Sequence, residues 1–223
     1  MKLVACLLTV ALAAAQMHPF PGPGTHGVGG GGGGGPFTDD FTRSNGGLGG
    51  NWTTITGLNA MQIDTLAASG TVIGDSSGAY WSANALGTDH YAQVSIDRSS
   101  GAEGLGPCVR VDTSTMSGYC WYANGMGATS RDLYRIVSGT FTLLSSSTSG
   151  ANTNGDVLKL VVSGTGATVT ISCYRNGSLD TSIGTSGVVS DTDATRLTGG
   201  THAGIVADGN SNAVDNFVCN SGS

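Results

Sequence analysis

Charged side chains are scarce in this chain, and cations are the scarcest. Of the 223 residues, 11% are charged, only nine are Lys or Arg, and Glu103 is the one glutamate. The nine cations are spread singly, so no basic stripe is present to neutralise phosphates. With a formal net charge of −6, the composition excludes nucleic acid as the expected partner.

Long apolar runs are also missing, except at the start of the chain. Lys2 precedes the apolar run Leu3–Leu12, and Ala13–Ala15 supplies small residues for cleavage. This order predicts a signal peptide over residues 1–15 and a secreted protein. The run is shorter than the roughly 20 residues that span a bilayer, so we predict no membrane span.

Glycine is what the chain has in excess, with 38 residues. Residues 16–36 combine Pro and Gly without apolar periodicity and contain seven consecutive glycines, which predicts a flexible tether. After Pro36, short alternating runs are separated by Gly, Asn, Asp and Ser. In 90–96, for example, Ala92, Val94 and Ile96 share one face. Residues 37–223 therefore predict one all-β sandwich or barrel domain.

Four cysteines remain after signal cleavage: Cys108, Cys120, Cys173 and Cys219. An even number in an exported chain predicts two disulfides, and three connectivities are open. Cys108 and Cys120 lie on the two arms of a predicted hairpin, which favours pairing them. Cys173 and Cys219 then form the second pair, because both occupy core-facing positions of their strands.

The same hairpin register predicts a surface patch. With Cys108 opposite Cys120, Val109 lies opposite Tyr119 on the inner face. Arg110 and Tyr122 then join the cysteines on the outer face, where an exposed Arg beside an exposed Tyr could contact a ligand. The alternative is a solvated Arg whose stem packs on a ring.

The order of segments resembles the bacterial and phage-borne concanavalin A-like (laminin-G/glucanase-type) domains with a "DDF-R-G-LG-NWT" opening. The resemblance covers nearly all of residues 37–219. The matching segments are 39–45, 47–53, 106–110, 119–122, 156–164, 169–177, 199–205 and 213–217. It implies a two-sheet antiparallel jelly-roll sandwich, a fold that carries lectins, adhesive modules, glycanases and lyases.

Catalytic residues are poorly represented. Glycoside hydrolysis uses two carboxylates, and glycanases of the resembled family carry them as Glu-x-Asp-x-x-Glu on one strand. Here Glu103 lies in a loop-like segment. Lyases of this fold use Tyr and His, but His90 and Tyr91 point to opposite faces of one strand. We therefore expect no catalytic residues and a non-enzymatic protein, with a glycanase or lyase the less favoured interpretation.

Sugar binding needs aromatic faces together with polar side chains. The predicted glycan-contacting residues are Trp81, Tyr91, Arg110 and Tyr122, each of which could instead belong to the core. Asn51 and Asn176 begin Asn-x-Ser/Thr sequons and are candidate N-glycosylation sites. The sequence thus favours a secreted lectin-like or adhesive module that binds a glycan or an extracellular surface. The alternative is a self-assembling structural component of an appendage, cell surface or virion.

A structural calcium ion is the one cofactor that we predict. The resemblance implies it, because glucanases of this fold hold calcium with a last-strand Asp, here Asp215. Asp39 and Asp40 on the first strand could complete the oxygen ligands. The alternative is that Asp215 bends outward or pairs with Arg43.

Overall fold

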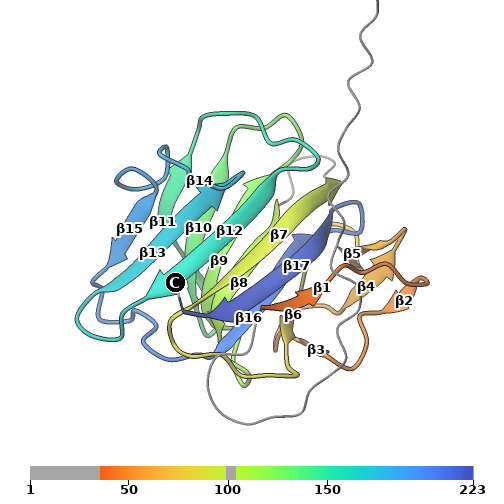
Figure 1. The fold of residues 1–223 in the computed structure, drawn as a ribbon, viewed down its shortest axis with the longest axis horizontal. Coiled ribbons are helices and arrows are strands. Elements are labelled where there is room, and N and C mark those ends of the chain that lie inside the picture. Colours follow the sequence, from red (N-terminus) through yellow and green to blue (C-terminus); the bar gives the residue numbers. More distant parts are fainter. Residues whose placement is uncertain (1–35, 99–103, 223) are drawn as a thin grey trace, which may run out of the picture. The chain divides into compact units, whose positions relative to one another are not determined.

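The computed structural model describes residues 36–98 and 104–222, and all regular elements in these ranges are β-strands (Figure 1). The predicted signal peptide, residues 16–35 of the predicted tether and Glu103 lie outside the described residues. Nowhere in the described part of the chain is there a helix long and apolar enough to cross a membrane. The predicted all-β fold class is confirmed.

Two antiparallel sheets face each other, and Figure 1 shows the larger one in front. The ten-stranded sheet runs β14 (Ser178–Leu179), β13 (Val169–Arg175), β12 (Val157–Ser163), β7 (His90–Arg98), β17 (Ala213–Ser221), β5 (Ala67–Gly70), β4 (Met61–Asp64) and β2 (Gly46–Gly47), with β1 (Phe37–Asp39) on β17 and β15 (Val188–Asp191) on β13. The seven-stranded sheet runs β11 (Thr140–Ser147), β10 (Arg131–Val137), β9 (Gly118–Asn124), β8 (Gly104–Val111), β16 (His202–Asp208), β6 (Ser76–Trp81) and β3 (Trp52–Thr54).

The main core fills the space between the sheets. Strand β7 alternates as the sequence predicts, with Ala92, Val94 and Ile96 buried and the residues between them partly exposed. From the other sheet, Tyr119 and Trp121 of β9 enter the same core. Burying apolar surface at roughly 25 cal/mol per Å² is the main driving force for closing such a sandwich.

The predicted hairpin of β8 and β9 is confirmed, including its register. Cys108 pairs with Cys120 and Val109 lies opposite Tyr119. The two cysteines form a disulfide with their Cα atoms 4.2 Å apart. This bond ties the centre of the seven-stranded sheet across neighbouring strands.

The predicted second disulfide, Cys173 to Cys219, is wrong. Both residues face the core as expected, and both are buried free thiols. They share one row of the sheet, but Leu160 and Ala92 stand between them. Three strand spacings place their Cα atoms about 14 Å apart, twice the reach of a disulfide. The alternation of inward and outward residues therefore predicts correctly that both thiols face the core, but it does not show that their strands are adjacent.

The predicted outer-face position of Arg110 is also wrong. Arg110 has a left-handed φ of +50°, at a register shift between β8 and β16. This bulge turns the side chain away from solvent, so that it is only 1% exposed. Its guanidinium donates to the carbonyls of Thr88, Gly164 and Leu197. Arg110 thus fastens loops at one end of the sandwich.

The backbone beside Arg110 is held by a neutral histidine. The Arg110 N–H donates to Nε2 of His90 at 2.9 Å, while Nδ1 lies 2.7 Å from the carbonyl of Gly87. Nδ1 must therefore carry the proton and Nε2 must accept. His90 is fully buried, and this burial lowers its pKa to about 4.

We expect this histidine to make the fold acid-sensitive. The unfolded chain binds the proton near pH 6.5, but the folded chain does so only near pH 4, so stability falls as the pH drops through this window. Between the upper and the lower end of this window, the pKa difference of His90 reduces the free energy of unfolding by about 3 kcal/mol. Urea unfolding of His90→Gln between pH 7 and 4.5 should show a flatter pH dependence than the wild type. An unchanged slope for His90→Gln would contradict the assignment.

Candidate functional site

Three aromatic rings gather on the outer face of the seven-stranded sheet. Tyr122 of β9, Tyr134 of β10 and Phe141 of β11 come from three adjacent strands. Their ring centroids lie 5.7 to 6.5 Å apart, with Tyr134 roughly perpendicular to both other rings. We call this set, with the neighbouring Leu143, the aromatic face.

The rings of the aromatic face differ in accessibility. Tyr122 is only 4% exposed, and Gly104 packs so closely that a Cβ there would come within 2.6 Å of its ring. Phe141 is 43% exposed and Leu143 is 52% exposed, while Tyr134 is half-buried. Tyr122 therefore supports the two rings from below, and Tyr134 and Phe141 meet the solvent.

Polar side chains border the rings on the same face. Asp132 lies directly opposite Tyr122 and Ser146 in the strand register. Its carboxylate accepts hydrogen bonds from the Ser146 hydroxyl and, at 2.7 Å, from the Asn124 amide. Burial and the nearby Asp132 charge raise the pKa of Tyr134, so its hydroxyl remains a donor at neutral pH. The face thus combines apolar ring surface with adjacent donors and acceptors.

The rest of this outer face is covered by a second apolar cluster. Its buried members include Tyr80, Val206, Ile136 and the Cys108–Cys120 disulfide, with Met116 packed against them. The cluster joins the aromatic face through Tyr122 and Tyr134. The rings therefore stand on a packed base, which restricts their rotamers.

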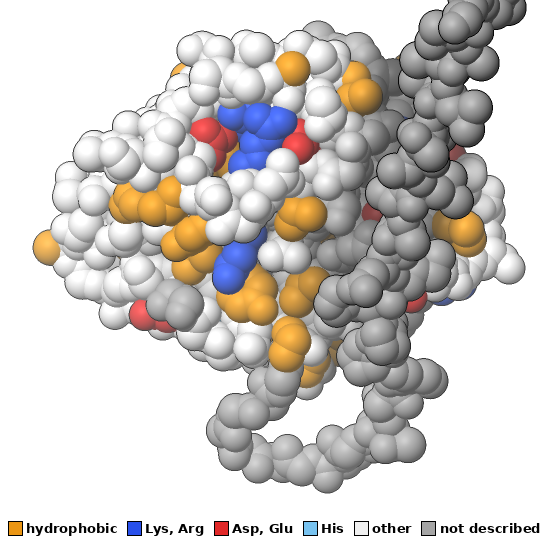
Figure 2. All heavy atoms as spheres, turned by 45° about the horizontal axis from the view of Figure 1, so that its top comes forward, with side chains coloured by type: hydrophobic (Ala, Val, Ile, Leu, Met, Phe, Trp, Pro, Cys, Tyr) orange, Lys and Arg blue, Asp and Glu red, His pale blue; other side chains and the backbone are white. Residues whose placement is uncertain are grey.

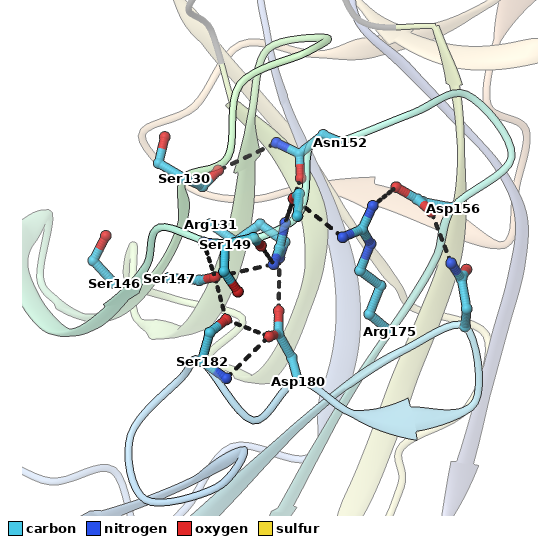
Figure 3. A network of polar contacts seen from close by, with 12 residues as sticks. Ser130, Arg131, Ser146, Ser147, Ser149, Asn152, Asp156, Arg175, Asp180 and Ser182 are labelled. Atoms are coloured by element: carbon cyan, nitrogen blue, oxygen red, sulfur yellow. Dashed lines mark hydrogen bonds and ion pairs between the residues drawn. The ribbon is translucent and has the colours of Figure 1, made fainter.

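A buried arginine fastens the strand that carries Tyr134 (Figure 3). Arg131, at the start of β10, uses all five of its N–H groups. Nε donates to Asp180 at 2.7 Å, and the two terminal nitrogens donate to Ser147, Asn152 and the carbonyls of residues 149 and 150. Burial would raise the pKa of Asp180, but hydrogen bonds from Arg131 and Ser182 outweigh it, and the pKa is lowered.

Arg175 reaches the same loop from the ten-stranded sheet. It donates to the carbonyls of Gly150 and Ala151 and pairs with Asp156 at 2.6 Å. Figure 3 shows both guanidinium groups turned toward this loop, which joins β11 to β12. The start of β10 and the end of β11 are therefore held by the buried contacts of Arg131, and the Arg175 contacts hold the loop that follows β11.

The structure does not bring the four predicted glycan-contacting residues together. Trp81 is buried in the main core against Trp52 and Phe217, and Arg110 is buried at its bulge. Tyr122 lies on the predicted outer face but is covered rather than exposed. Tyr91 is half-exposed on the outer face of the other sheet. The predicted exposed pair of Arg110 and Tyr122 is thus wrong.

Sequence reasoning missed two rings of the aromatic face, the half-buried Tyr134 and the exposed Phe141. Phe141 is not among the predicted glycan-contacting residues. Tyr134 lies in β10, a strand that no regular alternation of apolar and polar residues marks in the sequence. The predicted hairpin could have pointed to Tyr134. If the segment after the hairpin forms a third strand beside Gly118–Asn124, Tyr134 lies next to Cys120.

The three predicted metal ligands do not form a site. Asp39 is engaged by the Arg43 guanidinium, at 2.6 and 2.9 Å, and by the Trp52 indole at 2.7 Å. Asp40 is exposed and bonds Thr42. In the described ranges no three Asp, Glu, His or Cys side chains are grouped to hold an ion.

Regular alternation along β17 would place Asp215 on the same face as Phe217, but the two residues lie on different faces. Asn216 has a φ of +51° within a register shift of β17. Val214 and Phe217 consequently both face the core, and Asp215 remains half-exposed. Burial and the charges of Asp97, Asp40 and Asp39 raise the pKa of Asp215, while Arg43 pairs with Asp39 instead.

Both predicted glycosylation sequons lie at the surface. Asn51 is exposed in the turn before β3. Asn176 is exposed in the tight turn between β13 and β14, where its side-chain amide donates to Asp156 and its oxygen accepts from Val157. Attaching a glycan to Asn176 would disturb these bonds, so Asn51 is the better placed of the two predicted sites.

No protein-family model matches this chain, and no curated protein has a similar sequence. Several solved structures share its fold. The carbohydrate binding module CBM66 from Bacillus subtilis is 17% identical with a TM-score of 0.51, and the match covers 77% of this chain and 92% of that one. The winged bean acidic lectin complexed with methyl-α-D-galactose is 9% identical with a TM-score of 0.50, covering 82% and 96%.

The Ca²⁺- and mannose-bound exoplasmic/lumenal domain of VIP36 is also similar, with 8% identity, a TM-score of 0.50 and coverage of 76% and 82%. Identities this low establish the fold and nothing more. Two antiparallel sheets with these neighbours make the chain a jelly-roll sandwich of the concanavalin A-like, lectin-type fold, as the resemblance implied.

Proposed function

We propose that this chain is a non-catalytic carbohydrate-binding domain whose aromatic face holds a neutral sugar. The observation that carries the proposal is the pair of adjacent rings, the exposed Phe141 and the half-buried Tyr134, beside Asp132 on a lectin-type sandwich. The apolar side of a pyranose or furanose ring stacks on such rings. Its hydroxyls would bond the Asp132 carboxylate.

The charge on this face selects against acidic sugars. Asp132 lies beside the rings and Asp208 lies near Tyr122 and Tyr134, and these carboxylates would repel a uronate or a sulfate. The Asp132 carboxylate is also a strong acceptor for sugar hydroxyls, since hydrogen bonds to ionised groups are about twice as strong as neutral ones. Neutral hexose polymers are therefore the proposed ligand class.

Secretion belongs to the same proposal. It is supported by the signal-like order of residues 1–15 and by the Cys108–Cys120 disulfide, a bond typical of oxidising compartments. Binding to an extracellular glycan follows from this location. Self-assembly into a structural component remains the alternative.

A panel of immobilised neutral polysaccharides, including glucans, fructans, mannans and galactans, tests the proposal. The purified full-length protein should bind at least one of them, and Tyr134→Ala should weaken that binding strongly without changing the melting temperature by more than a few degrees. Recovery of the protein only in particles or fibres, with no binding to any polysaccharide, would favour the structural alternative.

Calcium is not required for the proposed site. Because Arg43 and Trp52 already occupy the Asp39 carboxylate, we expect calcium added to chelator-treated protein to leave the melting temperature unchanged. Calorimetry of the wild type, with Asp215→Ala as the control, checks this. A calcium-dependent rise that Asp215→Ala abolishes would restore the predicted chain-end calcium site.

A further inference from the structure

One of the cationic side chains in the described part of the chain, Lys159, lacks the polar contacts that the others make. Eight Lys and Arg side chains are described, and six of them are paired with aspartates: Arg43, Arg98, Arg110, Arg131, Arg135 and Arg175. Arg196 donates to the carbonyls of Gly166 and Asp193. Lys159 has neither an ion pair nor a hydrogen bond to a described residue.

Lys159 instead lies between two tyrosines on the outer face of the ten-stranded sheet. Its ammonium lies 3.9 Å from the ring centroid of Tyr91 and 5.9 Å from that of Tyr174. Figure 2 shows Lys and Arg atoms in blue on this side of the molecule, with orange hydrophobic side chains around the lower blue group. Ring contacts of this kind hold an ammonium by about 0.5–1 kcal/mol at exposed sites, without neutralising it.

The neighbours of Lys159 in the sheet are uncharged. Across the strands it lies opposite Gln93 on one side and Tyr174 on the other. In the adjacent row Tyr91 lies opposite Val161 and Asn220. A bound anion would therefore meet no carboxylate in these two rows, but would find amide and phenol groups. We call Tyr91, Lys159, Tyr174, Gln93 and Asn220 the lysine face.

We propose that the lysine face is a second binding site, for an acidic polysaccharide whose carboxylate or sulfate pairs with the Lys159 ammonium. A compact, strongly hydrated ammonium suits either anion. Amide side chains of Gln93 and Asn220 are placed to bond sugar hydroxyls, and the tyrosine rings offer apolar surface to the sugar. This combination of one cation with hydroxyl-binding groups favours a polysaccharide over an acidic peptide.

The lysine face and the aromatic face lie on the outer surfaces of opposite sheets, so the binding proposed for one face can be disproved without affecting the binding proposed for the other. The test measures binding of the full-length protein to polygalacturonate, dextran sulfate and uncharged dextran at low and at 300 mM salt. We expect Lys159→Gln to weaken binding to the acidic polymer about fivefold at low salt, as for an exposed ion pair, and to reduce its salt dependence. Arg196→Gln, which alters the other cation outside ion pairs, should not.

Each arm of this test has a defined meaning. If Lys159-dependent binding is seen with polygalacturonate alone, the recognised group is a carboxylate; if it is seen with dextran sulfate alone, the group is a sulfate. Binding to both polymers shows that the site accepts either anion. Each of these three outcomes supports the site. Equal binding of Lys159→Gln and wild type, or binding to dextran as strong as to the acidic polymers, overturns it. Lys159-dependent binding to polyglutamate without binding to either acidic polysaccharide also overturns it, since the partner would then be an acidic protein. The neutral panel tests the aromatic face separately.

Discussion

Replacing Arg131 with alanine should lower the free energy of unfolding by about 3–5 kcal/mol, the usual cost of removing one partner of a buried ion pair. Arg131 is 1% exposed, and it is the ion-pair partner of the buried Asp180. Its loss would leave that carboxylate without its counter-ion, and the carbonyls of the β11–β12 loop without donors. For a domain of this size the melting temperature should fall by roughly 6–20 °C.

Thermal and urea unfolding of Arg131→Ala measure this effect directly. Arg196→Ala is the matched control, because Arg196 contacts only backbone carbonyls and should change stability by less than about 0.5 kcal/mol. The double variant Arg131→Ala/Asp180→Ala should recover part of the loss, since no buried charge remains unpaired. A loss below about 1 kcal/mol for Arg131→Ala would show that water reaches this network.

The second large effect concerns ligand binding. Tyr134→Ala should weaken binding of a neutral oligosaccharide by about 2 kcal/mol or more, roughly thirtyfold, as expected for an aromatic residue at the centre of an interface. The ring meets Tyr122 and Phe141 edge to face, so its removal also releases Phe141. Titration calorimetry with the best-binding oligosaccharide of the neutral panel gives the affinity.

Two controls separate stacking from other effects of this change. Tyr134→Phe keeps the ring and should retain most of the affinity. Tyr91→Ala alters a tyrosine on the opposite sheet and should leave neutral sugar binding unchanged. If Tyr91→Ala weakens neutral binding while Tyr134→Ala does not, the sugar site lies on the lysine face instead.

The sequence predicts the framework of this fold well where alternation is regular. The sequence predicts the faces of β7 at Ala92, Val94 and Ile96 and the register of the β8–β9 hairpin, because apolar side chains alternate regularly in these segments. Arg110 is the exception in β8. Strand β10 was missed for the opposite reason. Its inward positions are Arg131, Leu133 and Arg135, and the two arginines are buried against Asp180 and Asp191. A strand whose inward positions carry buried ion pairs lacks the apolar alternation by which strands are predicted from sequence.

The candidate site was less predictable than the fold, and the reason is local backbone irregularity. Left-handed residues at Arg110 and Asn216 each shift a strand by one residue. A shift of this kind reverses the faces of the residues beyond it, so Arg110 became buried and Asp215 left the core face. Asparagine adopts the left-handed region more readily than most residues, but the arginine at position 110 gives no such signal. The cover over Tyr122 depends on Gly104 and Phe141, which lie on two other strands.

Backbone amide chemical shifts, recorded while a neutral oligosaccharide from the panel is titrated in, test the central claim most directly. The account predicts that the changes cluster on β9, β10 and β11, at Tyr122, Asp132, Tyr134, Phe141 and Leu143, and that the ten-stranded sheet is unaffected. Changes confined to the ten-stranded sheet or to its loops would contradict the account, as would a protein that binds the sugar with no shift on the aromatic face.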